Sequence, residues 1–109
     1  MANLTQDFDG RFTLEETKAA CEVEQSGGYQ LQKIEFATKV VNNEVLPVNR
    51  AELIRNPIGA SERLLFVQVG TQNPEHLKAQ KQNEGWTFVS YSQIYVAGDL
   101  EWVMVFKKK

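Results

Sequence analysis

The stretch QNEGWTF, residues 82–88, joins a polar segment of helical character to an apolar segment of strand character. Glycine ends helices readily because it takes the left-handed backbone conformation without steric cost, so Gly85 predicts the helix end. Trp86 follows directly. As the first strand residue it would point back under the helix, where a large ring joins helix to sheet. We therefore predict that Trp86 is a core residue rather than a ligand contact.

The same pattern occurs earlier in the chain. EQSGGYQLQKI, residues 24–34, aligns with KQNEGWTFVSY, residues 81–91, at a constant offset of 57 positions (86 − 29 = 57). Each copy has a helix, a glycine, an aromatic residue and apolar positions that change parity partway along the strand. One face of a strand cannot hold both parities, so we expect a bulge near residues 32–33. The chain is therefore predicted to contain two related units in tandem.

Capping signals locate the two helices. Thr13 starts a capping box ahead of a helix over residues 14–24, which ends at the glycine pair that follows. Asn73 is a good N-cap and Pro74 suits the first helical position, so a second helix is predicted to run to about Glu84. Each helix therefore opens one of the two units.

The remaining apolar segments predict strands, over residues 29–41, 64–69, 86–96 and 100–106. The last two form a hairpin across a turn at residues 97–99. Residues 1–12 are predicted to form a loosely attached arm or a short edge strand. Residues 42–63 are predicted to be a long polar connection that contains a single helical turn capped by Asn49.

These elements predict an α+β fold in a single domain, residues 1–109. Two helix–strand–strand units, residues 13–69 and 73–107, most simply give a four-stranded antiparallel sheet with both helices on one face. This order of elements makes the fold a permuted relative of ferredoxin-like folds. The predicted core comprises Leu14, Cys21, Tyr29, Leu31, Phe66, Leu77, Trp86, Phe88, Trp102, Met104 and Phe106.

NEGWTFVS, residues 83–90, and the closing stretch EWVMVFKKK, residues 101–109, resemble a small uncharacterised domain family of bacteria and phages. Members of that family have a helix, a Glu-Gly-Trp-Glu-Leu-like stretch, a hairpin, and a closing aromatic strand with a basic end. The resemblance covers the last third of the chain, and Thr87 stands where the family favours an acidic residue. It implies no catalytic residues, since none are established in the family, and would suit a phage or bacterial accessory or inhibitor protein.

The composition favours a cytoplasmic protein without a nucleic-acid or membrane partner. The formal net charge is −2, so no overall attraction to nucleic acid or to an anionic membrane is expected. The first residues show no basic segment followed by an apolar run, so no signal peptide is predicted, and no window approaches a membrane span. Cys21 is the only cysteine, which fits a reducing compartment.

No pattern of residues predicts catalysis, a cofactor or a metal site. His76 is the only histidine and is expected to be solvated in the first turn of a polar helix. Cys21 follows an alanine pair and is expected to be a small core residue rather than a nucleophile. No glycine-rich loop follows a strand in the order that a phosphate site needs. An enzyme is therefore not predicted.

Two surfaces are predicted to bind protein. If Trp102 and Met104 face the helices, the alternate residues of the two closing strands point to an open, apolar sheet face: Leu65, Val67, Val69, Val103 and Val105. The long connection supplies a second predicted contact surface, made of Leu53, Ile54, Arg55 and Ile58. A connection folded over its own core is the equally favoured alternative.

We therefore predict a non-catalytic protein-interaction module. It would form a homodimer through the open sheet face and contact a further protein partner. The alternative is a small-molecule sensor that holds its ligand where subunits meet, with polar groups converging from Arg63, Gln68 and Gln93.

Overall fold

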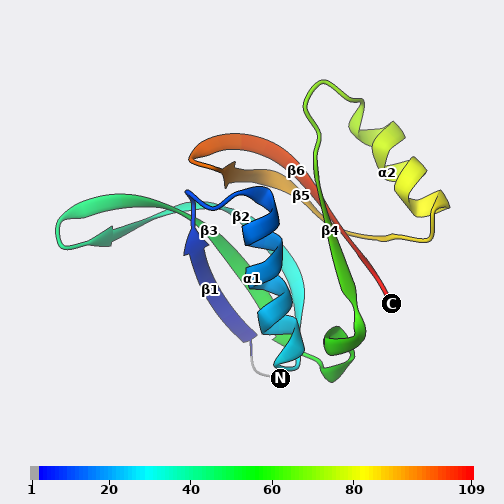
Figure 1. The fold of residues 1–109 in the computed structure, drawn as a ribbon, viewed down its shortest axis with the longest axis horizontal. Coiled ribbons are helices and arrows are strands. Elements are labelled where there is room, and N and C mark those ends of the chain that lie inside the picture. The colour runs from blue at the N-terminus through cyan, green and yellow to red at the C-terminus, as the bar shows by residue number, and fades with distance from the viewer. Residues whose placement is uncertain (1–2) are drawn as a thin grey trace.

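Residues 3–109 form two three-stranded antiparallel sheets and two α-helices; these are the residues that the computed structural model describes (Figure 1). In chain order the elements are β1 (Asn3–Asp9), α1 (Leu14–Ser26), β2 (Tyr29–Val41), β3 (Glu44–Arg55), the 3-10 helix η1 (Pro57–Ser61), β4 (Arg63–Gln68), α2 (Pro74–Asn83), β5 (Thr87–Val96) and β6 (Asp99–Lys108). The strand orders are β1-β3-β2 and β4-β6-β5. The α+β class is confirmed, whereas the single four-stranded sheet, and with it the permuted ferredoxin-like arrangement, is wrong.

The two halves of the chain are copies of one unit, strand–helix–strand–strand, with the last strand in the middle of the sheet. We call β1, α1, β2 and β3 the first unit, and β4, α2, β5 and β6 the second unit. Gly28 and Gly85, 57 positions apart, both have left-handed φ values, 96° and 94°. The register of each hairpin slips once, at Gln32 and at Val89, which are again 57 positions apart. The predicted repeat and the predicted bulge are therefore confirmed.

Each unit begins one strand earlier than the sequence indicates. Residues 64–69 were expected to close the first unit, but as β4 they open the second one, and β2 pairs with β3 instead. The alternative of an edge strand within residues 1–12 is confirmed by β1, which pairs with β3; residues 1–2 lie outside the described residues. The expected unit boundaries, 13–69 and 73–107, shift accordingly.

The expected long connection over residues 42–63 instead contains β3 and η1. Asn42 and Asn43 both have positive φ values, 51° and 64°, as a two-residue hairpin turn requires. Pro47 lies inside β3 although proline cannot donate a ladder hydrogen bond. It is tolerated because the strand pairing of β1 with β3 ends at Val48. On the β1 side only the Pro47 carbonyl is used, and it accepts from the Gly10 N–H.

Both predicted helix caps are present. The Thr13 hydroxyl accepts from the Glu16 N–H, and the Glu16 carboxylate accepts from the Thr13 N–H. Asn73 Oδ1 accepts from the N–H groups of Glu75 and His76. The caps fix where each helix starts, but α1 has 13 residues and α2 only 10. The shorter helix covers less of its sheet.

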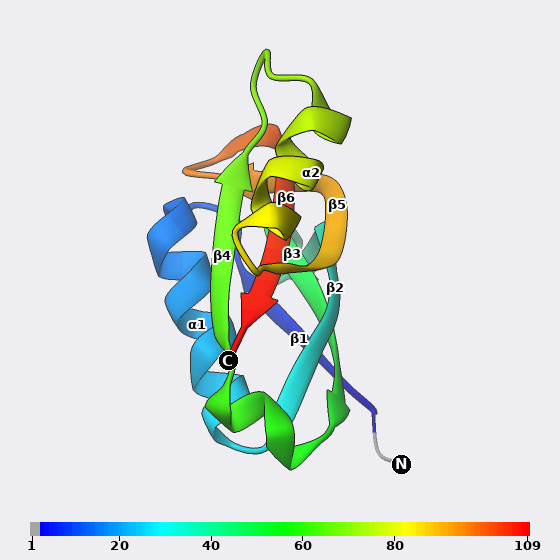
Figure 2. The same ribbon diagram turned by 90° about the vertical axis from the view of Figure 1, so that its right-hand side faces the viewer.

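β6 is buried on both faces over residues 103–106. Val103 and Val105 face a core that also holds residues of α1 and of the first unit's sheet. Met104 and Phe106 face the opposite way and pack beneath α2, together with the half-buried Trp86. Figure 2 shows α2 in front of the sheet of β4, β6 and β5, with the first unit behind it. Trp86 therefore joins helix to sheet, as the sequence predicts.

The β5–β6 hairpin fastens the second unit to the first. Asn49 of β3 is fully buried; its Nδ2 donates to the Tyr95 carbonyl over 2.8 Å, and its Oδ1 accepts from the Tyr95 N–H over 2.7 Å. The hairpin turn, Ala97 and Gly98, donates two N–H groups to carbonyl oxygens of the loop between β1 and α1. The first unit thus covers the end of this hairpin.

Candidate functional site

The open sheet face expected from the sequence is not an open surface. Val103 and Val105 are 2% and 0% exposed, because the first unit, including α1, covers them. Leu65 and Val67 pair with residues of β6 that face α2, so they lie half-buried on the opposite side of the sheet. Val69 is buried on that same side. The expected exposure is wrong for Val69, Val103 and Val105, which are buried. For Leu65 and Val67 the expected side of the sheet is wrong, and both are half-buried.

The second expected contact surface is only partly accessible. Leu53 belongs to β3 and is buried in the core, and Ile54 is half-buried. Arg55 is exposed and lies over the Tyr29 ring, 5.5 Å from its centroid. Ile58, in η1, is exposed as well. Of the four residues, Arg55 and Ile58 remain available to a partner.

The structure exposes a different apolar surface. Leu100 and Trp102 of β6 and Tyr91 of β5 share a face with Met104, but unlike Met104 they are exposed. The Tyr91 and Trp102 rings lie 5.0 Å apart, centroid to centroid. Phe36 of β2 is also exposed and lines one pocket with both of these rings. We call Phe36, Tyr91, Leu100 and Trp102 the aromatic surface.

The pocket in the aromatic surface is a hollow of 260 Å³ between β2 and the β5–β6 hairpin. Its polar lining comes from Glu35, Ser92 and Gln93. The Glu35 carboxylate lies 3.2 Å from Lys33 Nζ, so its charge is already paired. Gln93 is one of the three polar residues expected to converge on a ligand; the other two lie on β4 and do not line this pocket.

The internal repeat shows why this surface is exposed. Tyr91 corresponds to Ile34 at the offset of 57 positions, and Trp102 corresponds to Asn49, because their hairpin partners are 57 positions apart. Ile34 and Asn49 are 1% and 0% exposed, whereas Tyr91 and Trp102 are 38% and 48% exposed. In the first unit the β5–β6 hairpin covers this region. In the second unit no described element occupies the corresponding place.

Trp102 is the expected core residue that the structure contradicts. It was assigned to the core because it has the same strand parity as Met104 and Phe106. The composition of α2 carried the relevant signal: Leu77 and Ala79 are its only aliphatic residues, and Ala79 is exposed. A helix with one buried apolar side chain covers only part of its sheet, and Trp102 lies in the part left over.

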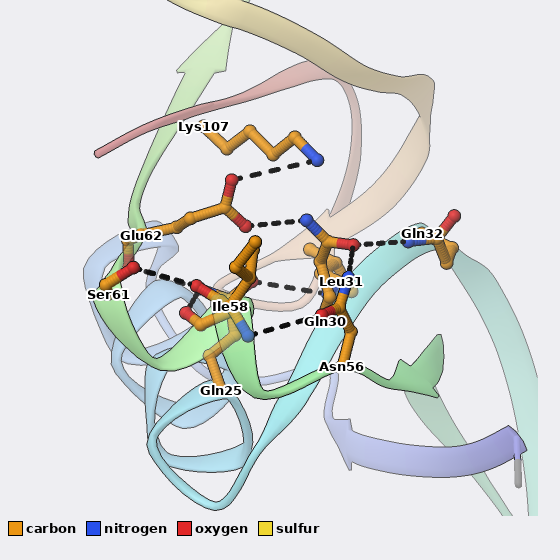
Figure 3. Close-up of polar contacts among 10 residues, drawn as sticks. Gln25, Gln30, Leu31, Gln32, Asn56, Ile58, Ser61, Glu62 and Lys107 are labelled. Atoms are coloured by element: carbon orange, nitrogen blue, oxygen red, sulfur yellow. Dashed lines mark hydrogen bonds and ion pairs between the residues drawn. The ribbon is translucent and has the colours of Figure 1, made fainter. Parts of the chain in front are cut away.

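A buried polar network lies where α1, η1, β2 and β6 meet (Figure 3). Gln30 Nε2 donates to the Glu62 carboxylate over 2.7 Å, and Lys107 Nζ lies 3.8 Å from that carboxylate. Gln25 Nε2 donates to the carbonyl groups of Gly59 and Glu62. Among residues 3–109, every buried side-chain nitrogen and oxygen has a hydrogen-bond partner. The network therefore ties these elements together and offers no unpaired group to a ligand.

Two arginine–carboxylate pairs lie on and beside β1. The hydrogen bond from Arg50, with its charge, holds the pKa of Asp7 below its usual value. Hydrogen bonds from the Arg11 side chain and N–H lower the pKa of Asp9 to about 2. Both carboxylates are ionised and paired at neutral pH, which is the electrostatics of a structural contact and not of a general base.

The single histidine lies on α2 and the single cysteine lies on α1. His76 is exposed in the first turn of α2, as expected. Cys21 is completely buried, and burial, together with the nearby Glu22 and Glu24, raises the pKa of its thiol to about 12. Within the described chain, His, Cys, Asp and Glu side chains form no group of three or more that would hold a metal ion.

We predict that Cys21 will not react with a thiol reagent such as DTNB at pH 8 while the chain is folded. The reason is that a buried thiol with a raised pKa supplies almost no thiolate and no access. Labelling should be at least about a thousandfold slower than in urea, because reaction must await unfolding. The measurement is the rate at which the absorbance of the released thionitrobenzoate rises, at a series of urea concentrations. Labelling at the rate of a free thiol in native buffer would contradict complete burial.

Comparison of the chain with protein-family models, with curated proteins and with solved structures finds no match. The resemblance of the last third to a bacterial and phage domain family therefore stays a prediction. Of the helices in the described part of the chain, none is long and apolar enough to cross a membrane.

Proposed function

We propose that this chain is a non-catalytic protein-interaction module that self-associates through the aromatic surface. One observation carries the proposal: positions that are buried in the first unit are exposed in the second and hold Tyr91 and Trp102. Exposed apolar patches usually mark interfaces, and tryptophan and tyrosine are enriched among the residues that dominate binding energy. The proposal keeps the homodimer expected from the sequence but moves its contact surface.

The chemistry of the surface supports binding over catalysis. Its pocket is walled by three aromatic rings, and its one carboxylate, Glu35, is paired with Lys33. An accessory or inhibitor role in a phage or bacterium would suit a binding module of this size. That role rests on the family resemblance alone.

A small-molecule sensor is the second candidate, and the pocket favours it. Gln93 and Ser92 present polar groups beside the Tyr91 and Trp102 rings, an arrangement that suits a flat, partly polar ligand. Because Trp102 lies in the pocket, such a ligand would change tryptophan fluorescence. A metabolite screen that gives saturable fluorescence changes in the wild type, but none in Trp102→Leu, would favour the sensor. A screen without such a change would count against it.

We expect the wild type to sediment as a dimer of about 25 kDa, twice the 12.4 kDa of one chain, at tens of micromolar. Trp102→Glu should weaken dimerisation by about 30-fold or more, the effect of losing an interface hot spot of about 2 kcal/mol. Sedimentation equilibrium over a concentration series measures both constants.

Val23→Glu is the matched control, since Val23 is an exposed apolar residue on α1 and receives the same charge. It should leave the dimer unchanged. Circular dichroism should show that both variants remain folded. A wild type that stays monomeric at these concentrations would contradict the proposed function, as would equal weakening by the two variants.

A further inference from the structure

The β2–β3 hairpin carries apolar side chains beyond the body of the molecule. Strand pairing of β1 with β3 stops at Val48, and the Gly10 N–H still donates to the Pro47 carbonyl. Beyond that contact, residues 38–46 form a two-stranded ribbon, which we call the free hairpin end (Figure 1). Val40 and Val45 face each other across this ribbon and are 67% and 66% exposed. An isolated two-stranded ribbon is marginally stable in water, and valines that remain exposed to water add no stabilisation from burial. We therefore expect the Val40 and Val45 face of the free hairpin end to be covered by another protein surface.

The second unit shows what covers such an end. Its own hairpin end, around Ala97 and Gly98, corresponds to the turn at residues 42–43 and is docked on the first unit. The region it covers contains Asn49, which corresponds to Trp102 of the aromatic surface. Within one chain, then, one hairpin end fills one receiving surface. The Val40 and Val45 face of the other hairpin end and the other receiving surface both stay open.

The free hairpin end and the aromatic surface lie on one continuous strip. Phe36, which lines the aromatic pocket, lies on the same face of β2 as Val40, four residues further along the strand. The hairpin that carries them is also the longer one, with strands of 13 and 12 residues against 10 and 10 in the second unit. Two such strips laid antiparallel would place each hairpin end over the other chain's aromatic surface.

A different way of adding a second copy is disfavoured by charge. Within the chain, the sheet face that carries Val103 and Val105 covers the first unit. In the alternative arrangement, a second copy would cover the aromatic surface with the corresponding face of its own first sheet. The corresponding residues of the first unit are Arg50 and Glu52, both in ion pairs on that face. Burying these charges against apolar side chains is costly. Head-to-tail stacking, which would give an open filament, is therefore not favoured.

We propose that the partner is a second copy of this chain and that the free hairpin end of each chain covers the aromatic surface of the other about a two-fold axis. This rests on the proposed function, which names the surface but not what covers it. The contact is reciprocal. The valines of each free hairpin end, Val40 and Val45, pack against Tyr91 and Trp102 of the other chain. Each dimer thus contains two equivalent contacts, and each contact needs one intact hairpin end and one intact aromatic surface.

Complementation between two variants tests this arrangement. Val40→Glu combined with Val45→Glu replaces the apolar contacts of the hairpin end by charges, and Trp102→Glu does the same in the receiving surface. All three residues are exposed, so the fold should persist. Each variant alone should lose dimerisation by at least about 30-fold, as expected for hot-spot residues. At the same total concentration, an equimolar mixture should contain more dimer than either variant alone but less than the wild type, because one of the two contacts in the mixed dimer is intact.

The outcomes separate the two proposals. If the wild type is monomeric, the proposed function itself fails. If Trp102→Glu abolishes the dimer but the hairpin variant dimerises like the wild type, self-association stands and the hairpin contact is overturned. If both variants are monomeric and their mixture shows no dimer, the reciprocal contact is overturned.

Cross-linking gives an independent measurement. Chains carrying Val40→Cys and chains carrying Trp102→Cys, mixed and treated with a short bismaleimide, should form a covalent dimer. Cys21 should not interfere because it is completely buried. Val23→Cys mixed with Trp102→Cys is the matched control and should stay uncross-linked. Cross-linking of Trp102→Cys chains to one another, with none to Val40→Cys chains, would overturn the hairpin contact.

Discussion

Replacing Asn49 by aspartate will destabilise the fold by about 3 kcal/mol at neutral pH, as expected when one partner of a buried hydrogen-bonded pair becomes an unpaired charge. Asn49 is 0% exposed and uses both ends of its amide on Tyr95. Aspartate keeps the acceptor for the Tyr95 N–H. It loses the donor to the Tyr95 carbonyl and points a carboxylate oxygen at that carbonyl instead. Urea denaturation monitored by circular dichroism measures the loss.

Acidification tests the cause. A protonated carboxylic acid can donate to the Tyr95 carbonyl, so burial and the carbonyl should raise the pKa of the new aspartate above its unfolded value of about 3.9. The folded variant then holds its proton more tightly than the unfolded chain. The penalty should therefore be full above the folded pKa and should shrink as the pH falls through it towards 3.9. The comparison is the difference between variant and wild type at each pH.

Asn73→Asp is the matched control. Asn73 caps α2 through its Oδ1 alone, and aspartate is an equally good N-cap, so stability should change by less than about 0.5 kcal/mol. A similar loss for both variants, or a penalty for Asn49→Asp that does not depend on pH, would contradict the proposed role of Asn49.

The features that could be predicted from the sequence are those set by local chemistry. Thr13 and Asn73 cap helices through atoms two or three residues away, and Gly28 and Gly85 supply the left-handed conformation that each reversal needs. Such signals do not depend on the rest of the fold. The repeat was visible for the same reason, because it recurs in these local signals.

The features that could not be predicted depend on contacts between the units. A strand containing Pro47 and a buried Asn49 resembles a polar connection until the β5–β6 hairpin supplies the partner for Asn49. Likewise, strand parity places Trp102 on the helix side of its sheet. It does not show whether α2 is long enough to cover Trp102. The predicted exposure of Val103 and Val105 was wrong for the same reason, because the first unit covers that face of the second unit's sheet.

Replacing Gly59 by alanine will destabilise the fold by about 3 kcal/mol, the upper part of the range for overpacking a tightly packed site. A Cβ added there would overlap the Tyr29 carbonyl oxygen and would lie 3.0 Å from its carbon and 3.1 Å from the Gln30 Cα. These are backbone atoms of β2, which the ladder to β3 holds in place. η1 and β2 cannot move apart without breaking the network around Gln25, because the Gln25 amide donates to the Gly59 carbonyl.

The cost should come from this contact and not from backbone conformation, because Gly59 does not have a left-handed φ. Gly27→Ala is the matched control. Gly27 also has a negative φ, −80°, and its added Cβ would meet nothing closer than the Glu24 carbonyl oxygen at 3.3 Å. Its substitution should change stability by less than about 1 kcal/mol, since alanine also reduces the entropy of the unfolded chain. Equal effects of the two substitutions in urea denaturation would show that η1 can move away from β2 at little cost, and would contradict the proposed role of the close contact between Gly59 and β2.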